Sequence, residues 1–194
     1  MPCRSRLLRL SILSALSALL TACGHVPVTS LLAMSRINFE TTDISAMRAA
    51  LRIPLAYQAR ENRMVVEITQ EGKPPHRSEF ALERLTGAAE LSLIGSEKRA
   101  GQELVVYKLP DAMIAKFEEM RTEARKAKDE KRKGSLTIKL EPDFCYVAEP
   151  PKGSLVFSTY LRTSETRSYV PVLQDLDGFS QPEFAEKILV MPKC

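Results

Sequence analysis

The sequence contains no tryptophan, aromatic residues make up only 6% of its 194 residues, and its two histidines are His25 and His76. So few aromatic side chains argue against a stacking platform for bases or sugar rings. Two histidines and four scattered cysteines do not supply the clustered ligands of a zinc site. We therefore expect neither a metal nor a cofactor.

Motifs of nucleophilic and metal-dependent catalysis are also missing. The mature part of the chain has no G-x-S-x-G, no phosphate loop ending in Gly-Lys-Ser/Thr, no H-E-x-x-H and no S-x-x-K. A calcium loop starting at Asp175 fails because Phe179, Ser180 and Pro182 occupy positions that need a ligand, a glycine and a continuous loop. A pair of carboxylates acting as general acid and base has no fixed spacing, so an enzyme without a motif is kept as the third hypothesis. The leading expectation is a non-enzymatic protein.

A basic excess is confined to the N-terminus. The whole chain has 28 lysines and arginines against 24 acidic residues, a net charge of +4. Residues 1–22 contain three arginines and no acid, so the remaining 172 of the 194 residues carry 25 basic residues and a net charge of +1. Proteins that bind nucleic acid usually neutralise phosphates with a basic face. We expect no nucleic-acid partner, and a chain of this length suits one domain.

The first 23 residues, MPCRSRLLRLSILSALSALLTAC, have the organisation of an export signal. Three arginines precede an uncharged run over 10–22, which is shorter than the ~20 apolar residues that span a bilayer. The run ends in LTAC at 20–23, which resembles the lipobox of bacterial lipoproteins. The resemblance implies cleavage before Cys23, a diacylglycerol thioether on Cys23, and acylation of the new amino terminus with a fatty acid such as palmitate. A transmembrane anchor with a coincidental cysteine is the alternative.

The interpretation of the chain as a lipoprotein divides it into a removed signal peptide (1–22), a lipidated tether (23–38) and a single periplasmic domain (39–194). The lipid anchor makes the membrane a partner and places the protein in the cell envelope, facing the periplasm. Gly24 stands where some lipoproteins retained in the inner membrane carry aspartate, which favours the outer membrane. The stretches CGHVPVTSL and STYLRTSETRSYVPV resemble small proteobacterial lipoproteins of uncharacterised function, a family that brings no active residues to transfer.

The lipoprotein reading also leaves one pair of cysteines. Cys3 leaves with the signal and Cys23 is acylated, so Cys145 and Cys194 remain. An even pair in an oxidising periplasm is expected to form a disulfide. The alternative is two unrelated thiols.

Apolar spacing and turn residues predict an α+β fold: a single domain with a mainly antiparallel sheet and one long amphipathic helix packed on one face. Two strands are expected to form a hairpin around the turn EGKPP at 71–75, and Cys145 is expected in an irregular connection. The expected elements are helices over 43–53 and 111–133, strands over 64–70, 76–84, 91–94, 104–109, 136–141, 155–159 and 169–173, and a short C-terminal helix after a turn at 175–178.

The best candidate surface lies in STYLRTSETRSY at 158–169. There Arg162 and Arg167 can flank an anionic ligand, with Thr163, Ser164 and Thr166 donating hydrogen bonds. A polar hairpin loop that keeps the sheet end soluble is the alternative. The leading functional hypothesis is an interaction or structural module that contacts an envelope protein or polymer. The second is a binding protein for a small anionic or lipidic ligand.

Overall fold

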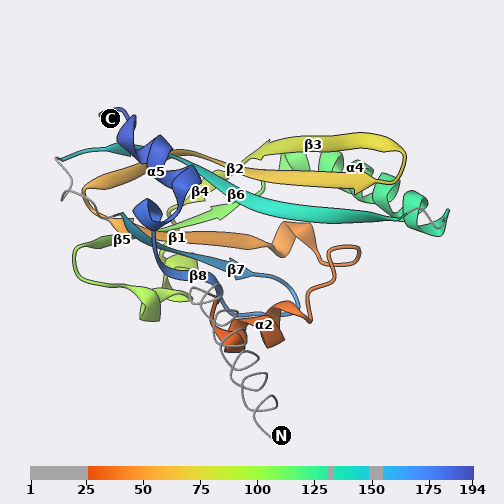
Figure 1. Cartoon of the computed structure of the whole chain (residues 1–194). Coiled ribbons are helices and arrows are strands. Elements are labelled where there is room, and N and C mark those ends of the chain that lie inside the picture. Colours follow the sequence, from red (N-terminus) through yellow and green to blue (C-terminus); the bar gives the residue numbers. More distant parts are fainter. Residues whose placement is uncertain (1–25, 131–132, 149–154) are drawn as a thin grey trace, which may run out of the picture.

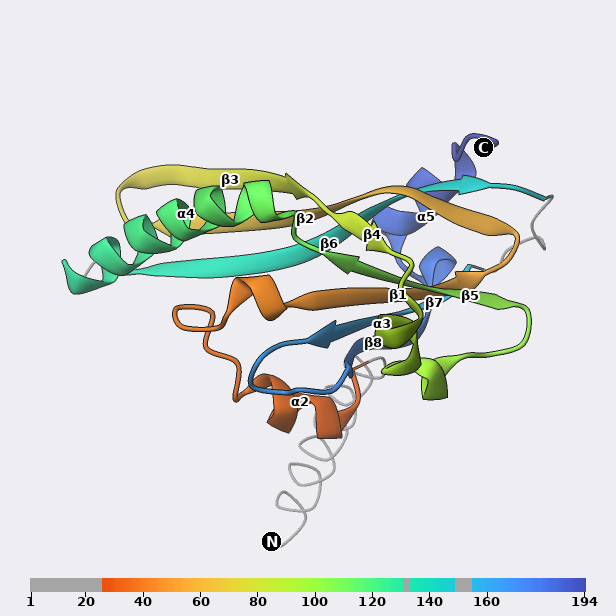
Figure 2. The same ribbon diagram turned by 180° about the vertical axis from the view of Figure 1, so that it is seen from behind.

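The computed structural model describes residues 26–130, 133–148 and 155–194 (Figures 1 and 2). The predicted signal peptide and lipidation site Cys23 lie outside the described residues. The fold is α+β, and all strand pairs of its two sheets are antiparallel. Within the described ranges, no helix combines the length and the apolar character needed to cross a membrane.

The elements alternate irregularly along the chain. The helices are α2 (Val28–Met34), α3 (Ala88–Ser92), α4 (Asp111–Asp129) and α5 (Pro182–Leu189), with 3-10 turns η1 (Ile44–Ala46), η2 (Gly95–Glu97) and η3 (Gly178–Ser180). The strands are β1 (Arg48–Pro54), β2 (Tyr57–Gln70), β3 (Lys73–Ala81), β4 (Glu83–Leu85), β5 (Gln102–Lys108), β6 (Gly134–Tyr146), β7 (Val156–Arg162) and β8 (Val170–Asp177). Helix α2 lies beside β8, in a segment expected to be a tether without periodicity.

Two sheets lie one above the other (Figures 1 and 2). One has the strand order β4-β5-β1-β7-β8, and the other has the order β3-β2-β6. On one side β3 runs almost directly into β4, so the chain itself joins the two sheets. On the other side the sheets end in β6 and β8, which belong to different sheets and leave the layers open along this side.

The predicted hairpin is confirmed, with a shorter turn. Gln70 of β2 pairs with Lys73 of β3, so only Glu71 and Gly72 form the connection. Gly72 has a φ of +77°, which glycine adopts without a steric penalty. Both prolines of the EGKPP segment lie in β3 instead, and they are tolerated there because β3 is the edge strand of its sheet.

The predicted helix over 43–53 is wrong, because only η1 is helical there and residues 48–54 form strand β1. The strand lies between β5 and β7, and four consecutive residues, Ala50 to Ile53, are buried. A strand covered on both faces has no alternation of apolar and polar residues. Its apolar residues therefore matched a helical spacing by chance.

Two further predictions are corrected. Residues 91–94 do not form a strand: Leu91 lies in the short helix α3, and Ile94 is buried against the outer face of the five-stranded sheet. Such a short apolar run does not distinguish strand from helix. Cys145 lies in β6 rather than in an irregular connection, because β6 continues through Pro142 and pairs with β2 as far as Tyr146.

A β-bulge in β2 keeps both halves of this long strand facing the interior. The pairing with β6 shifts between Ala59 and Glu61. Tyr57 and Ala59 are buried before the shift, and Asn62 and Met64 are buried after it. One extra residue reverses which positions face inward, so the bulge lets β2 contribute to the core along its whole length.

Helix α4 has 19 residues and packs against one end of the three-stranded sheet (Figure 2), where Phe117 lies 5.6 Å from Phe80 between ring centroids. The finer prediction, one sheet with a single long amphipathic helix on one face, is not borne out. There are two sheets, and the helices are short, the other three having five to eight residues. At the opposite end of the same sheet lies α5 (Figure 1), which confirms the short C-terminal helix.

Candidate functional site

An apolar groove opens between the two sheets on the side where they end in β6 and β8. Its cavity volume is about 600 Å³, within the roughly 300–1,000 Å³ of small-molecule sites. Strands β6, β7 and β8 and helix α5 form its walls. The lining residues are Ile138, Lys139, Leu140, Glu141, Pro142, Asp143, Phe144, Leu155, Phe157, Thr159, Val172, Leu173, Phe184, Lys187, Ile188, Val190, Met191 and Pro192.

The walls are apolar because alternate strand residues face the space between the sheets. On β7, Phe157 belongs to the core cluster between the sheets, whereas Tyr160 belongs to a cluster on the outer face. On β6, Ile138 and Phe144 pack against the core from the same face of the strand. On the side where the sheets end in β6 and β8, these inward side chains also line the groove.

Three phenylalanines that line the groove contact one another. The rings of Phe144 and Phe157 lie 6.3 Å apart and join the two sheets, and Phe184 of α5 lies 5.9 Å from Phe157 in an edge-on arrangement. These distances are in the range of favourable aromatic pairs. The groove is therefore preformed by side chains from both sheets and from α5.

The predicted disulfide is confirmed, and it attaches the C-terminal segment to the groove wall. Cys145 of β6 is bonded to Cys194 across a sequence separation of 49. Beside it, the Tyr146 amide donates to the carbonyl of Pro192 at 3.1 Å, and the Cys194 amide donates to the carbonyl of Tyr146 at 3.0 Å. These bonds fix the end of α5 relative to β6.

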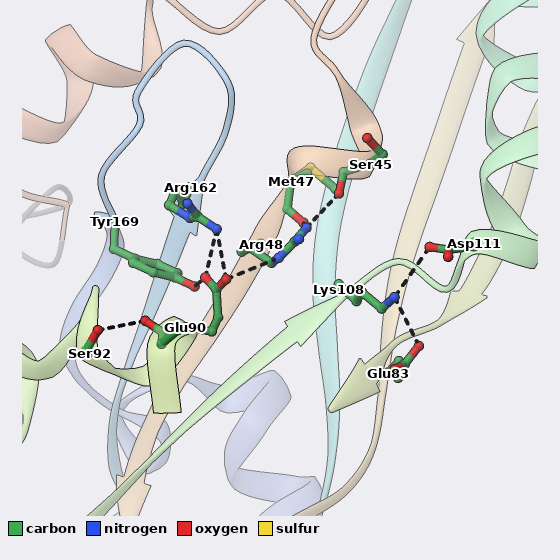
Figure 3. A network of polar contacts seen from close by, with 11 residues as sticks. Ser45, Met47, Arg48, Glu83, Glu90, Ser92, Lys108, Asp111, Arg162 and Tyr169 are labelled. Carbon is green, nitrogen blue, oxygen red and sulfur yellow. Dashed lines mark hydrogen bonds and ion pairs between the residues drawn. The ribbon is translucent and has the colours of Figure 1, made fainter. Parts of the chain in front are cut away.

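The predicted anion-binding residue Arg162 is already paired with an acid. Its guanidinium contacts both carboxylate oxygens of Glu90 at 2.8 and 3.1 Å, as Figure 3 shows. The Tyr169 hydroxyl donates to the same carboxylate at 2.6 Å, and Arg48 lies 3.7 Å from it. Burial, and then the hydrogen bond to Glu90, raise the pKa of Tyr169. The acid comes from α3, so this cluster fastens α3 to the outer face of the five-stranded sheet.

The other residues predicted to bind an anion lie in the loop between β7 and β8, where several of them are hydrogen-bonded to residues of that loop. Thr163 is buried, and its amide donates to the Thr166 hydroxyl at 2.9 Å. The Ser164 hydroxyl donates to Glu165 at 3.0 Å. Arg167 has a φ of 55°, is exposed, and forms no ion pair with any described residue. The loop is also attached to the segment before β1, because the Thr42 hydroxyl donates to Glu165 at 2.8 Å and the Asp43 amide donates to the Ser164 hydroxyl at 3.4 Å. None of the residues predicted to bind an anion lines the groove.

A second acid, Glu97, fastens the segment that contains α3 and η2 to the five-stranded sheet. Arg52 of β1, only 1% exposed, contacts Glu97 of η2 at 3.3 Å and Asp175 of β8 at 2.5 Å. The Tyr160 hydroxyl also donates to Glu97 at 2.9 Å. Burial, and then the hydrogen bond to Glu97, raise the pKa of Tyr160 to about 12. Glu90 and Glu97 thus act as two attachment points for the segment that covers this face.

Two other cavities are more polar in character. One of about 690 Å³ lies between α4 and the ends of β2 and β6, and it contains the Lys128–Glu40 ion pair at 2.6 Å. Another, of about 480 Å³, lies between α4 and β3 beside His76. The His76 ring is hydrogen-bonded to Ser78 at 3.0 Å on the exposed edge strand. Within the described ranges, no group of three or more histidine, cysteine or acidic side chains is arranged to hold a metal ion.

Comparison with protein-family models, with curated proteins and with solved structures gives no match for this chain. The groove was not predicted from the sequence. One available signal was the spacing of Phe184 and Ile188, which gives the C-terminal helix an apolar side that needs a partner. The other signal was Phe144, an aromatic residue in the segment predicted to be an irregular connection, where the strand β6 in fact continues.

Proposed function

We propose that this protein is a non-enzymatic module of the cell envelope, anchored by lipid at Cys23 and facing the periplasm, which binds an aliphatic ligand in the groove between β6 and β8. The observation that carries the proposal is the groove itself: a preformed cavity of about 600 Å³ between two sheet edges, with apolar walls. Ligand sites of this size typically combine apolar walls with a few polar groups at defined points. The proposal keeps the second hypothesis from the sequence, but places its site in the groove rather than at Arg162 and Arg167.

Binding would be favoured by burial of the chain. Each methylene group that leaves water contributes about 0.8 kcal/mol, so a chain of several methylenes offsets the cost of association. The proposed anchor supports this role because it holds the domain beside a membrane, where aliphatic molecules are concentrated. The outer membrane is the proposed location, following Gly24 after the lipidated cysteine.

Photo-crosslinking tests the proposal on the full chain in isolated envelopes. An aliphatic probe with a diazirine within its chain is added, activated by light, and located by peptide mass spectrometry. We expect adducts in peptides that cover 138–144, 155–159, 172–173 and 184–192, the walls of the groove. Adducts spread evenly over the protein would refute a groove site.

A pair of matched variants sharpens this test. Leu173→Asp places a charge in the groove wall and should abolish the groove adducts. Leu93→Asp makes the same chemical change at a residue that is 57% exposed outside the groove, and it should leave them unchanged. Thr159→Phe fills the groove without a charge and serves if Leu173→Asp fails to fold, as judged by circular dichroism. Equal labelling of folded groove variants and Leu93→Asp would contradict the proposal.

A further inference from the structure

Helix α2 carries an apolar side that faces solvent. Val28, Leu31 and Leu32 are 77%, 53% and 70% exposed, and Leu31 and Leu32 follow Val28 by three and four residues. Residues at this spacing lie on the same side of a helix. Ser30 lies on the other side and is only 1% exposed, and the helix itself lies beside β8. The apolar side therefore has no covering element among the described residues.

We infer that the apolar side of α2 docks on the surface of a lipid bilayer, with Val28, Leu31 and Leu32 inserted among the headgroups. Exposed apolar side chains that gather on one side of a helix mark an interaction surface. Helices that lie in a membrane interface bury such a side at the boundary between headgroups and acyl chains. The inference rests on the lipid anchor of the proposed function but not on its groove, and it goes beyond that function by giving the membrane a second contact.

The short connection between the lipidated cysteine and α2 favours the bilayer over a partner protein. Val28, the first residue of α2, is the fifth residue after Cys23. Five residues of fully extended chain reach about 17 Å at most. The headgroup layer of one leaflet is itself roughly 5–8 Å thick. A lipid on Cys23 therefore keeps α2 close to the headgroups, where the nearest apolar phase that can cover its exposed side is the bilayer.

Polar residues next to the apolar side suit the same location. Thr29, Ser35 and Arg36 are exposed, and Arg36 follows the helix, where a cation is attracted to anionic lipid headgroups. Helix α2 lies beside β8, and Leu173 of β8 lines the groove. Docking of α2 therefore holds one wall of the groove near the membrane, which is the source of the aliphatic ligands that the groove is proposed to bind.

The absence of tryptophan from the chain allows a direct test with a single fluorophore. Leu32→Trp places it on the apolar side of α2. Leu55→Trp places it at a residue that is 59% exposed in the turn between β1 and β2, away from α2 (Figures 1 and 2). Each full-chain variant is purified with its lipid and reconstituted into vesicles of phosphatidylethanolamine and phosphatidylglycerol with brominated acyl chains. Because bromine quenches tryptophan only at close contact, we expect a loss of fluorescence for Leu32→Trp and none for Leu55→Trp.

Further substitutions separate insertion of the helix from its nearness to the anchor. Val28→Asp with Leu31→Asp, added to Leu32→Trp, should abolish the quenching, whereas Leu55→Asp with Val147→Asp, at exposed apolar residues of other segments, should preserve it. Equal quenching of Leu32→Trp and Leu55→Trp in proteins that float with the vesicles would overturn the inference and leave the anchor and the groove standing. Failure of the unmodified full chain to float with the vesicles would instead overturn the anchor in the proposed function, and with it this inference.

Discussion

Replacing both disulfide cysteines should destabilise the protein by about 4 kcal/mol. The bond closes a loop with a sequence separation of 49, and loop-closure entropy for that length corresponds to about 4 kcal/mol at 25 °C. Cys145 is fully buried, so the suitable change is Cys145→Ala with Cys194→Ala, which leaves no polar group in the core. The loss acts mainly through the unfolded chain, which gains conformations when the link is removed.

Urea unfolding followed by circular dichroism measures this effect. The oxidised protein should unfold at a clearly higher urea concentration than the double variant, and a reductant should lower the oxidised protein to the level of the variant. The reductant should leave the variant unchanged, which makes it the control. A difference below about 1 kcal/mol would refute the reasoning that this bond holds the C-terminal segment as a major constraint on the fold.

Three further predictions concern the core and the sheets. Arg52→Ala should lower the free energy of unfolding by about 3 kcal/mol or more, because it removes a buried guanidinium with two acidic partners, whereas Arg84→Ala at an exposed pair should cost about 0 to 1 kcal/mol in urea unfolding. Gly134→Ala should lower the thermal unfolding midpoint, because an added Cβ would lie 2.4 Å from the backbone oxygen of Thr69. Burial raises the pKa of Tyr107 and Tyr160 from 10.0 to about 12. Ultraviolet titration should show both still protonated at pH 11. Since the unfolded chain loses these protons first, stability should be intact below pH 10 and fall between pH 10 and 12.

The sequence predicted correctly the elements whose structure depends on residues close together along the chain. The hairpin of β2 and β3 could be predicted because a turn with Gly72 separates the apolar positions of β2 from Phe80 of β3, and the two strands are neighbours along the chain. Strands β5, β7 and β8 were also located correctly, since each has bulky apolar residues between turn signals. Strand β1 could not be located because, between β5 and β7, it is buried on both faces and shows no alternation of apolar and polar residues.

The site at Arg162 shows why functional residues were harder to predict. Its arginine, hydroxyls and short spacing suggested an anion site, but its partner Glu90 lies 72 residues away. A carboxylate at that separation leaves no trace in the local pattern. In the folded protein, Arg162 is paired with Glu90 and attaches α3 to the sheet, so it does not serve as the predicted ligand contact.

The sequence alone predicted the location of the protein in the cell envelope, from the basic head, the apolar run and Cys23. It also predicted which two cysteines form the disulfide. The lipid anchor stays a prediction. Only the tertiary structure decided where a ligand can bind, because the groove is made by three strands and a helix that are distant along the chain. Apolar residues on each of them look like ordinary core residues in the sequence. They line an open groove because the two sheets part between β6 and β8, a consequence of packing that no single segment encodes.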